Sequence, residues 1–263
     1  MFGKNFYANR SILDNEFIQA NFDPSTGLAP EEIDMRLKEL FDQKIENTST
    51  AILRAEMFAF LYDNVQIEIN EKNLFAAKIN HQKVFCKYTN LFKKHILSHY
   101  SPQTLDLQAE AVEWGCKPCI DYHHTLPNWN DIHSLGFPGL LDRAKKRQAE
   151  LLQNSSATQE QKDFLQSVII VYSAIMRLLC RIHGESLKYP AAQMFSECIH
   201  ELMLHEPRTI YQAMMLTDLF MMIYEVGLEN ARSFGLIDRL YEPLYLADLE
   251  KGRFTEAEVR ELF

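Results

Sequence analysis

The sequence predicts a mainly α-helical protein with few short strands. Only 9 of its 263 residues are glycine, which is about half of the usual share of ~7%. Apolar residues make up 47% of the chain, enough to bury a sizeable core. In several segments these residues recur every three or four positions, which places them on one face of a helix. The composition excludes a disordered chain, a collagen-like repeat and a small disulfide scaffold.

The charge and the cysteine content narrow the expected partners and compartment. The formal net charge is −9, and such an acidic balance disfavours nucleic acid and anionic membranes, which both need a positive field. A small molecule or a protein is therefore the expected partner. The five cysteines fit reduced thiols, and the first residues lack a secretory signal, so we expect a cytoplasmic protein. The longest uncharged apolar stretch, residues 164–176, is shorter than the ~20 residues that cross a bilayer and predicts a buried helix.

The first half of the chain predicts helices around one short strand. Pro30 opens a helix over residues 31–41, whose first turn is acidic. Residues 49–64 repeat apolar side chains at helical spacing and predict a second helix. Residues 65–70 alternate apolar and polar side chains, which predicts a short strand. The helical pattern then returns over residues 71–100.

A loop-like segment follows at residues 114–138, with three prolines, two glycines, two cysteines and three histidines. Loops on a rigid scaffold often carry function, so this segment is of interest. A helix is expected over residues 140–153, and then a polar break over residues 153–161. Ser156 and Gln159 stand there at the spacing of a capping box for the next helix. We expect one region over residues 1–263, with this break as its possible internal boundary.

The last part of the chain predicts three more helices and an irregular stretch. The helices are expected over residues 164–182, 191–204 and 209–226, and a final helix is expected to begin at Thr255. Asp218 is the one carboxylate in the middle of the otherwise apolar third helix. It predicts a buried, hydrogen-bonded structural group, with acid–base chemistry as the alternative.

Cys116, Cys119, His123 and His124 form the cluster that most resembles a metal site. Thiolates and imidazoles can complete a tetrahedral zinc shell, but a common zinc site needs a second pair of ligands, for which His133 is the nearby candidate. Structural thiols and a redox pair are the alternatives. A metal site made by Cys116, Cys119 and His123 stays open at this point.

Several segments, taken in order, resemble the N-terminal part of the glycyl radical enzymes, the pyruvate formate-lyase family with its diol and glycerol dehydratase relatives. Residues 53–56 and 65–79 resemble the early Arg-Ala helix and the extended segment after it. Residues 123–141 resemble the Gly-His loop and the Leu-x-x-Gly-Leu-x-Gly-Ile helix start. Residues 205–225 resemble the Pro-x-x-Thr-Phe helix, and residues 233–262 resemble the Ser-Leu-Gly-Arg-Leu-Asp-Gln segment, the most specific of these matches.

This resemblance implies a helical shell and a partial α/β barrel of the pyruvate formate-lyase type. In the family a backbone glycyl radical makes a cysteine thiyl radical. The sequence contains no Arg-Val-Ser/Ala-Gly-Tyr loop, and none of its cysteines is followed after one residue by glutamate: Cys86, Cys116, Cys119, Cys180 and Cys198. The resemblance therefore implies a truncated or split part of a lyase or dehydratase of anaerobic metabolism that acts on a small polar molecule and is inactive alone. It implies no cofactor in this chain, because a complementary C-terminal chain would supply the glycyl radical.

The resemblance also implies three substrate-binding residues and no catalytic residue. His124 matches the histidine of the Gly-His loop, Ser233 matches the serine of the Ser-x-Gly segment, and Asp238 matches the acidic residue that follows it. We expect these three side chains to lie together around one pocket.

The sequence departs from the family motifs at four positions near these residues. His123 replaces the loop glycine, Asn128 an aspartate, Leu236 an arginine and Arg239 a glutamine. The loss of the arginine removes a forked donor that suits carboxylates. These changes favour an alternative function. In this alternative the chain is a non-catalytic helical interaction or regulatory protein that is derived from the fold. A part of this fold would also expose apolar surface, so self-association is expected where no complementary chain covers it.

Overall fold

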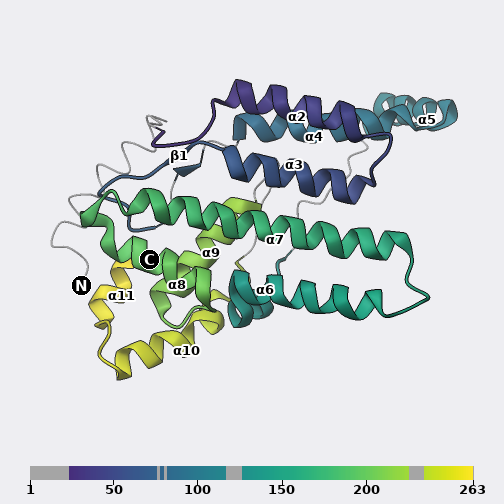
Figure 1. Ribbon diagram of the computed structural model, residues 1–263. Coiled ribbons are helices and arrows are strands. Elements are labelled where there is room, and N and C mark those ends of the chain that lie inside the picture. The colour runs from purple at the N-terminus through teal and green to yellow at the C-terminus, as the bar shows by residue number, and fades with distance from the viewer. Residues whose placement is uncertain (1–23, 76–77, 80–81, 117–125, 225–233, 263) are drawn as a thin grey trace.

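The computed structural model describes residues 24–75, 78–79, 82–116, 126–224 and 234–262, and over these residues it confirms a mainly helical fold (Figure 1). The strands of this described part form one two-stranded antiparallel sheet. The elements in chain order are α2 (Pro30–Lys44), α3 (Thr50–Asn64), β1 (Ile67–Glu68), β2 (Lys78–Ile79), α4 (Gln82–Ser98), α5 (Pro102–Glu113), α6 (Trp129–Leu152), α7 (Gln159–Ser186), the 3-10 turn η1 (Pro190–Ala192), α8 (Gln193–Leu204), α9 (Ile210–Tyr224), α10 (Ile237–Glu250) and α11 (Glu256–Leu262).

The first predicted helices and the strand are confirmed. Pro30 is the first residue of α2, and Ser49 caps α3 by accepting a hydrogen bond from the backbone of Ile52. The strand predicted over residues 65–70 is β1, and its Glu68 pairs with Lys78 of β2 at 3.0 Å. The helix predicted over residues 71–100 was wrong in its first part, because the chain first turns back to form β2.

Helix α7 connects the two halves of the fold, since it packs on α3 on one side and on α6 and α8 on the other (Figure 1). Arg181 of α7 donates to the carbonyl oxygens of Tyr62 and Val65, both at 2.7 Å. These carbonyls belong to the last turn of α3, where no intrahelical donor remains for them. One guanidinium therefore satisfies the end of α3 and fixes α3 against α7.

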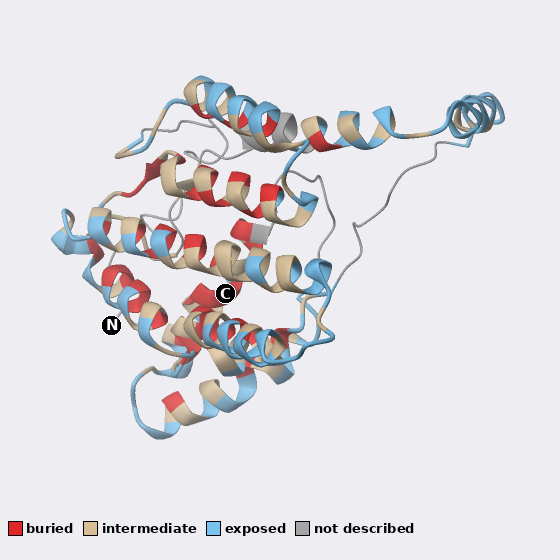
Figure 2. Ribbon diagram, turned by 45° about the vertical axis from the view of Figure 1, so that its right-hand side comes forward, coloured by how far each residue is buried: buried red, intermediate tan, exposed pale blue. Residues whose placement is uncertain are grey.

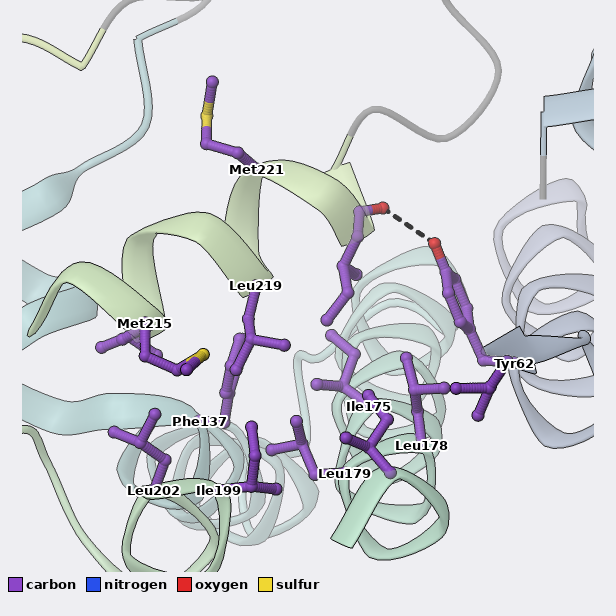
Figure 3. Packing of buried hydrophobic residues seen from close by; sticks show 14 of the residues in the cluster. Tyr62, Phe137, Ile175, Leu178, Leu179, Ile199, Leu202, Met215, Leu219 and Met221 are labelled. Atoms are coloured by element: carbon purple, nitrogen blue, oxygen red, sulfur yellow. Dashed lines mark hydrogen bonds between the residues drawn. The ribbon is translucent and has the colours of Figure 1, made fainter. Parts of the chain in front are cut away.

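One continuous apolar core joins the helices on both sides of α7. Figure 3 shows its centre, where Phe137, Ile175, Ile199 and Leu219 come from four different helices, α6, α7, α8 and α9. The Tyr62 hydroxyl donates to the carbonyl of Ile223 at 3.1 Å, which joins α3 to the end of α9 (Figure 3). Figure 2 shows that buried residues line the faces that the helices turn toward each other.

The segment predicted as a loop contains the start of α6, which begins at Trp129. Gly136 interrupts this helix with a φ of 59°, a conformation that favours glycine, and the helix restarts with Pro138 near its new beginning. A Cβ added at Gly136 would lie 3.0 Å from the carbonyl oxygen of His205. Gly136 and Pro138, two of the residues that indicated a loop, lie at a sharp kink in the helix.

Two further predictions about helices need correction. The capping box of α7 uses Thr158 and Gln161, two residues later than the predicted pair Ser156 and Gln159. Helices α5 and α10 were not predicted at all; α10 lies within the stretch that was expected to be irregular.

Helix α7 is less buried than the sequence predicted. Its Phe164 is 59% exposed, whereas the later residues Ala174 and Ile175 are buried. By length and composition α7 is also the one described helix apolar enough to cross a membrane. A single helix of this kind is weak support for a membrane protein, because a core helix passes the same test. The contacts of α7 with α3, α6 and α8 are those of a core helix.

Candidate functional site

The two segments that carry the predicted substrate residues approach each other. Gly235 has a φ of +63°, and a Cβ added to it would lie 3.6 Å from Leu126 Cδ1 and 3.5 Å from Trp129 Cδ1. Leu126 follows the predicted loop histidine by two residues, and Gly235 follows the predicted serine by two. The fold therefore brings these parts of the chain together, and the positive φ of Gly235 is a conformation that favours glycine.

The predicted substrate residues themselves are only partly described. Asp238 lies exposed in the first turn of α10. His124 and Ser233 lie outside the described residues, so their proximity to Asp238 stays a prediction.

Beside this contact, α6, α9 and α10 share one buried hydroxyl, that of Thr217. His133 Nε2 lies 2.9 Å from Thr217 Oγ1, and the Tyr241 hydroxyl is hydrogen-bonded to the same side chain. The Thr217 hydroxyl also donates to the carbonyl of Ala213 at 3.0 Å. The donor in the contact between Thr217 and His133 depends on the tautomer of the imidazole.

The other ring nitrogen of His133, Nδ1, is buried and has no hydrogen-bond partner among the described residues. Burial lowers the pKa of His133 to about 4, so the imidazole is neutral at pH 7. Burial also raises the pKa of Tyr241. The hydrogen bond with Thr217 lowers this pKa, and the negative charge of Asp218 raises it. The three side chains are therefore neutral at pH 7 and orient one another.

Tyr241 also lines an open groove between α10 and α11, with a volume of about 420 Å³. The groove is lined by Ile210, Ile237, Asp238, Tyr241, Glu242, Tyr245, Glu256, Val259 and Arg260. Arg260 is paired with Glu256 at 2.8 Å, which leaves the carboxylates of Asp238 and Glu242 in excess. Such a groove accepts hydrogen bonds from hydroxyl and ammonium groups and disfavours anions.

The sequence indicated the wrong polar residue of α9 as the buried one. It predicted a buried Asp218, but Asp218 is exposed and its neighbour Thr217 is buried. The helix is apolar over most of its surface, so the sequence did not reveal which of the two neighbours faces the core. His133 was considered only as a zinc ligand, and its hydrogen bond to a residue 84 positions away had no local signal.

Only one residue of the predicted metal site is described. Cys116 is an exposed free thiol, while Cys119, His123 and His124 lie outside the described residues. Among the residues that the structure describes, no three histidine, cysteine or acidic side chains are placed to hold a metal ion. A metal site at Cys116, Cys119 and His123 therefore stays a prediction.

Comparison with known proteins identifies the type of fold. A family model described as "Pyruvate formate lyase-like" matches residues 48–263. No curated protein matches the sequence. Hydroxyproline dehydratase from Clostridioides difficile, solved with trans-4-hydroxy-L-proline bound, has a TM-score of 0.68 at 17% sequence identity. This similarity covers 92% of the present chain and 37% of the dehydratase.

Two further solved structures give the same result. A glycyl radical enzyme from Archaeoglobus fulgidus has a TM-score of 0.68 at 15% identity, over 91% of this chain and 38% of that one. Glycerol dehydratase from Clostridium butyricum, with glycerol bound, has a TM-score of 0.61 at 16% identity, over 82% and 34% of the two chains. The present chain thus spans less than two fifths of the length of these enzymes. It belongs to the pyruvate formate lyase-like family.

Proposed function

We propose that this chain forms the N-terminal, helical part of a glycyl radical lyase or dehydratase that acts on a small hydroxylated molecule. The observation that carries the proposal is the similarity of 92% of the chain to hydroxyproline dehydratase, at a TM-score of 0.68. In this proposal the radical glycine and the thiyl cysteine belong to the remaining part of the enzyme, because these 263 residues contain the motif for neither.

The chemistry of the groove between α10 and α11 supports this substrate class. The lining residues Asp238, Glu242 and Tyr245 carry oxygen atoms that can accept hydrogen bonds from a ligand. The molecules in the names of the similar structures, trans-4-hydroxy-L-proline, glycerol and 1,2-propanediol, all carry hydroxyl groups. We propose that Asp238, with Ser233 and His124, binds such a hydroxyl group.

The part played by the helices themselves follows from the reactivity of radicals. A thiyl radical must react with substrate in a site closed to solvent, because water and small molecules in open solution lead to side reactions. We propose that α6, α9 and α10 wall one side of that site, and that the hydrogen bonds around Thr217 hold these three helices in a fixed arrangement.

The test combines the purified chain with a polypeptide that carries the Cys-x-Glu and Arg-Val-x-Gly-Tyr motifs, activated without oxygen. The neighbouring reading frame is the first candidate for that polypeptide. We expect a stable complex in size-exclusion chromatography, and loss of water from 1,2-propanediol, glycerol or trans-4-hydroxy-L-proline only when both polypeptides are present. A complementary polypeptide that neither binds the chain nor needs it for turnover would contradict the proposal.

A non-catalytic interaction protein is the second candidate, and one observation favours it. Leu236, which replaces the arginine of the family motif, lies exposed at the start of α10, beside the groove-lining Ile237 and Asp238. Its side chain cannot donate a hydrogen bond to a substrate carboxylate. Two results together would support this candidate instead. The chain would bind the complementary polypeptide and change the activity of that polypeptide, and the variant Asp238→Asn would change this activity to the same extent.

A further inference from the structure

A second groove lies between the end of α7 and the start of α8, which η1 connects (Figure 1). Its volume is about 470 Å³, and it shares no lining residue with the groove between α10 and α11. Two histidines and two glutamates line it: His183, His200, Glu197 and Glu201. No lysine or arginine is among the described residues of its lining. The charges of this groove are therefore negative, and its lining contains both nitrogen and oxygen atoms that can bind a metal ion.

The two histidines of this groove come from different helices and lie next to each other. The ring centres of His183 on α7 and His200 on α8 are 5.1 Å apart, and the ring planes are inclined by 35°. Two imidazoles that bind one tetrahedral ion have ring centres ~5 Å apart, because each binding nitrogen lies ~2.0–2.1 Å from the metal. The packing of α7 on α8 therefore places the two rings at the spacing of a shared ion.

The ring of His183 is held in place by Ser196, a buried residue of α8. His183 Nδ1 lies 3.2 Å from the carbonyl oxygen of Ser196 and 3.2 Å from its Oγ. In the tautomer that donates from Nδ1 to this carbonyl, Nε2 carries the electron pair that a metal ion needs. A hydrogen bond of this kind, from the other ring nitrogen to a carbonyl, orients most histidines that bind metals. The exposed His200 can then adjust its ring to an ion on His183.

Glu197 can supply a third ligand. Among the described residues, no third metal-binding side chain is already placed beside the two histidines. Glu197 precedes His200 by one turn on the same face of α8, and it is exposed, so its side chain can turn toward the rings. Its Oε1 accepts from Gln193 at 2.7 Å, which leaves Oε2 for a metal. Glu201 is the weaker candidate, because its carboxylate already lies 3.1 Å from His205 Nε2.

We propose that His183, His200 and Glu197 bind a divalent transition-metal ion, with water in the fourth position. The ligands determine the class of ion. Mg²⁺ and Ca²⁺ take oxygen ligands, whereas imidazole suits zinc, copper, nickel and iron. Two imidazoles and one carboxylate form a common zinc shell with one open position, and the negative charge of the groove attracts a cation. A bound ion joins the end of α7 to α8, and Zn²⁺ is the probe for the experiments.

The first test measures Zn²⁺ binding by isothermal titration calorimetry at pH 7. The starting protein is the metal-free variant Cys116→Ser/Cys119→Ser, in which the separately predicted cysteine site cannot contribute. We expect one Zn²⁺ per chain. His200→Ala should weaken binding at least about tenfold, because even the loss of a residue that only orients a ligand costs ~10–100-fold in metal affinity.

A matched variant controls for zinc on exposed histidines elsewhere. His99→Ala removes an exposed histidine at the end of α4 and should leave the affinity unchanged. His200 is exposed as well, so without zinc His200→Ala should have the circular dichroism and the stability of the starting protein.

The second test identifies the ligands one by one. The carbon-bound ring protons of the histidines are followed by nuclear magnetic resonance as Zn²⁺ is added, and variants assign each signal. The signals of His183 and His200 should shift and that of His99 should not. For the carboxylate, Glu197→Gln keeps the size of the side chain and removes its charge, so it should weaken Zn²⁺ binding at least about tenfold. Glu160→Gln, an exposed position at the start of α7 outside the groove, should leave binding unchanged.

Three results would overturn the proposal: a starting protein that binds no Zn²⁺, an affinity that His200→Ala leaves unchanged, or a loss of binding in His99→Ala instead. An affinity that Glu197→Gln leaves unchanged would remove Glu197 from the site. The proposal is independent of the proposed function. Zinc binding is measured without substrate or a complementary polypeptide, so either proposal can fail while the other stands.

Discussion

The environment of His133 differs from that of a solvent-exposed histidine. Its Nε2 is hydrogen-bonded to a buried threonine, its Nδ1 has no hydrogen-bond partner among the described residues, and burial lowers its pKa to about 4. Protonation would place a positive charge among the aromatic rings of Trp129 and Tyr241 in the protein interior. The folded protein therefore resists this protonation, and the unfolded chain does not.

This difference predicts a loss of stability in mild acid. The pKa of His133 is about 4 in the folded protein and 6.5 when unfolded, so the unfolded state binds the extra proton first as the pH falls. The free energy of unfolding should drop by up to about 1.4 kcal/mol per pH unit from pH 6.5 toward pH 4. Above pH 6.5 this histidine should cause no pH dependence.

Urea denaturation at a series of pH values measures this effect, with His133→Leu as the test variant. The variant should lose stability less steeply between pH 6.5 and 4 than the unmodified chain. The exposed His200 provides the control, and His200→Leu should keep the original slope. Parallel curves for His133→Leu and the unmodified chain would contradict the assigned pKa.

Asp248 is a second residue with a structural role. Its side chain is fully buried (0% exposed), and it accepts from the backbone of Ile210 at 2.7 Å and from Arg253 at 2.9 Å. It thereby binds α10 to the start of α9, where backbone donors lack an intrahelical partner. Asp248→Ala should lower the free energy of unfolding by about 1–3 kcal/mol, because the backbone donor of Ile210 loses its acceptor, whereas Arg253 is 41% exposed and can turn to solvent.

Thermal or urea denaturation checks this value, with Glu250→Ala as the control. Glu250 is an exposed carboxylate on the same helix, and its loss should change stability by less than about 0.5 kcal/mol. Equal effects of the two variants would show that Asp248 does not hold α9 and α10 together.

The contact of α7 with the end of α3 depends on a planar side chain. Arg181 uses two nitrogens on two carbonyl oxygens, Tyr62 O and Val65 O, and a lysine can reach only one of these positions well. Arg181→Lys should lower the free energy of unfolding by about 1–3 kcal/mol. The measurement is urea denaturation of both proteins at pH 7.

A neighbouring arginine on the same helix supplies the control. Arg177 also forms a bidentate salt bridge with Asp63, but the side chain of Arg177 is half exposed. Exposed ion pairs contribute little, so Arg177→Lys should cost less than about 1 kcal/mol. A larger loss for Arg177→Lys than for Arg181→Lys would contradict the role given to Arg181.

The sequence predicted those elements whose local pattern agrees with their burial. In α2 the buried Ile33, Leu37 and Phe41 recur at helical spacing, and Pro30 marks the first turn. Alternation also identified β1, although Ile67 and Glu68 are both buried. Its partner β2 has only two residues, which is too short to show a pattern in the sequence.

The elements that the sequence missed have specific physical reasons. The start of α6 contains Gly136 and Pro138, which usually end a helix, yet here a single glycine bends the chain and the proline follows at a tolerated position. Helix α10 carries Pro243 in its interior. Helix α5 has no buried residue, so no one-sided apolar pattern marks it.

The predicted substrate site stays a prediction, although two observations are compatible with it. Asp238 lines a groove, and the two chain segments that the resemblance paired meet at Gly235. The resemblance did not indicate Thr217, because a single buried hydroxyl in an apolar helix has no motif. Tyr241 was likewise missed, since its role depends on the contact of three helices.

One prediction concerns the use of this groove in the assembled enzyme. Asp238→Asn keeps the size of the side chain and removes its charge, so the exposed site should fold normally. We expect kcat/KM for a hydroxylated substrate to fall at least about tenfold, because a hydrogen bond to a charged acceptor contributes roughly 1.5 kcal/mol or more. Glu250→Gln, on the same helix but outside the groove, is the control and should leave kcat/KM unchanged.

The central claim, that this chain is one part of a glycyl radical lyase or dehydratase, is tested most directly by a titration. A fixed amount of activated complementary polypeptide is mixed with increasing amounts of the chain, and the initial rate of water loss from 1,2-propanediol, glycerol or trans-4-hydroxy-L-proline is measured without oxygen. We expect a rate near zero without the chain. As the chain is added, the rate should rise and then saturate at one chain per complementary polypeptide. A rate that is the same with and without the chain would contradict the central claim.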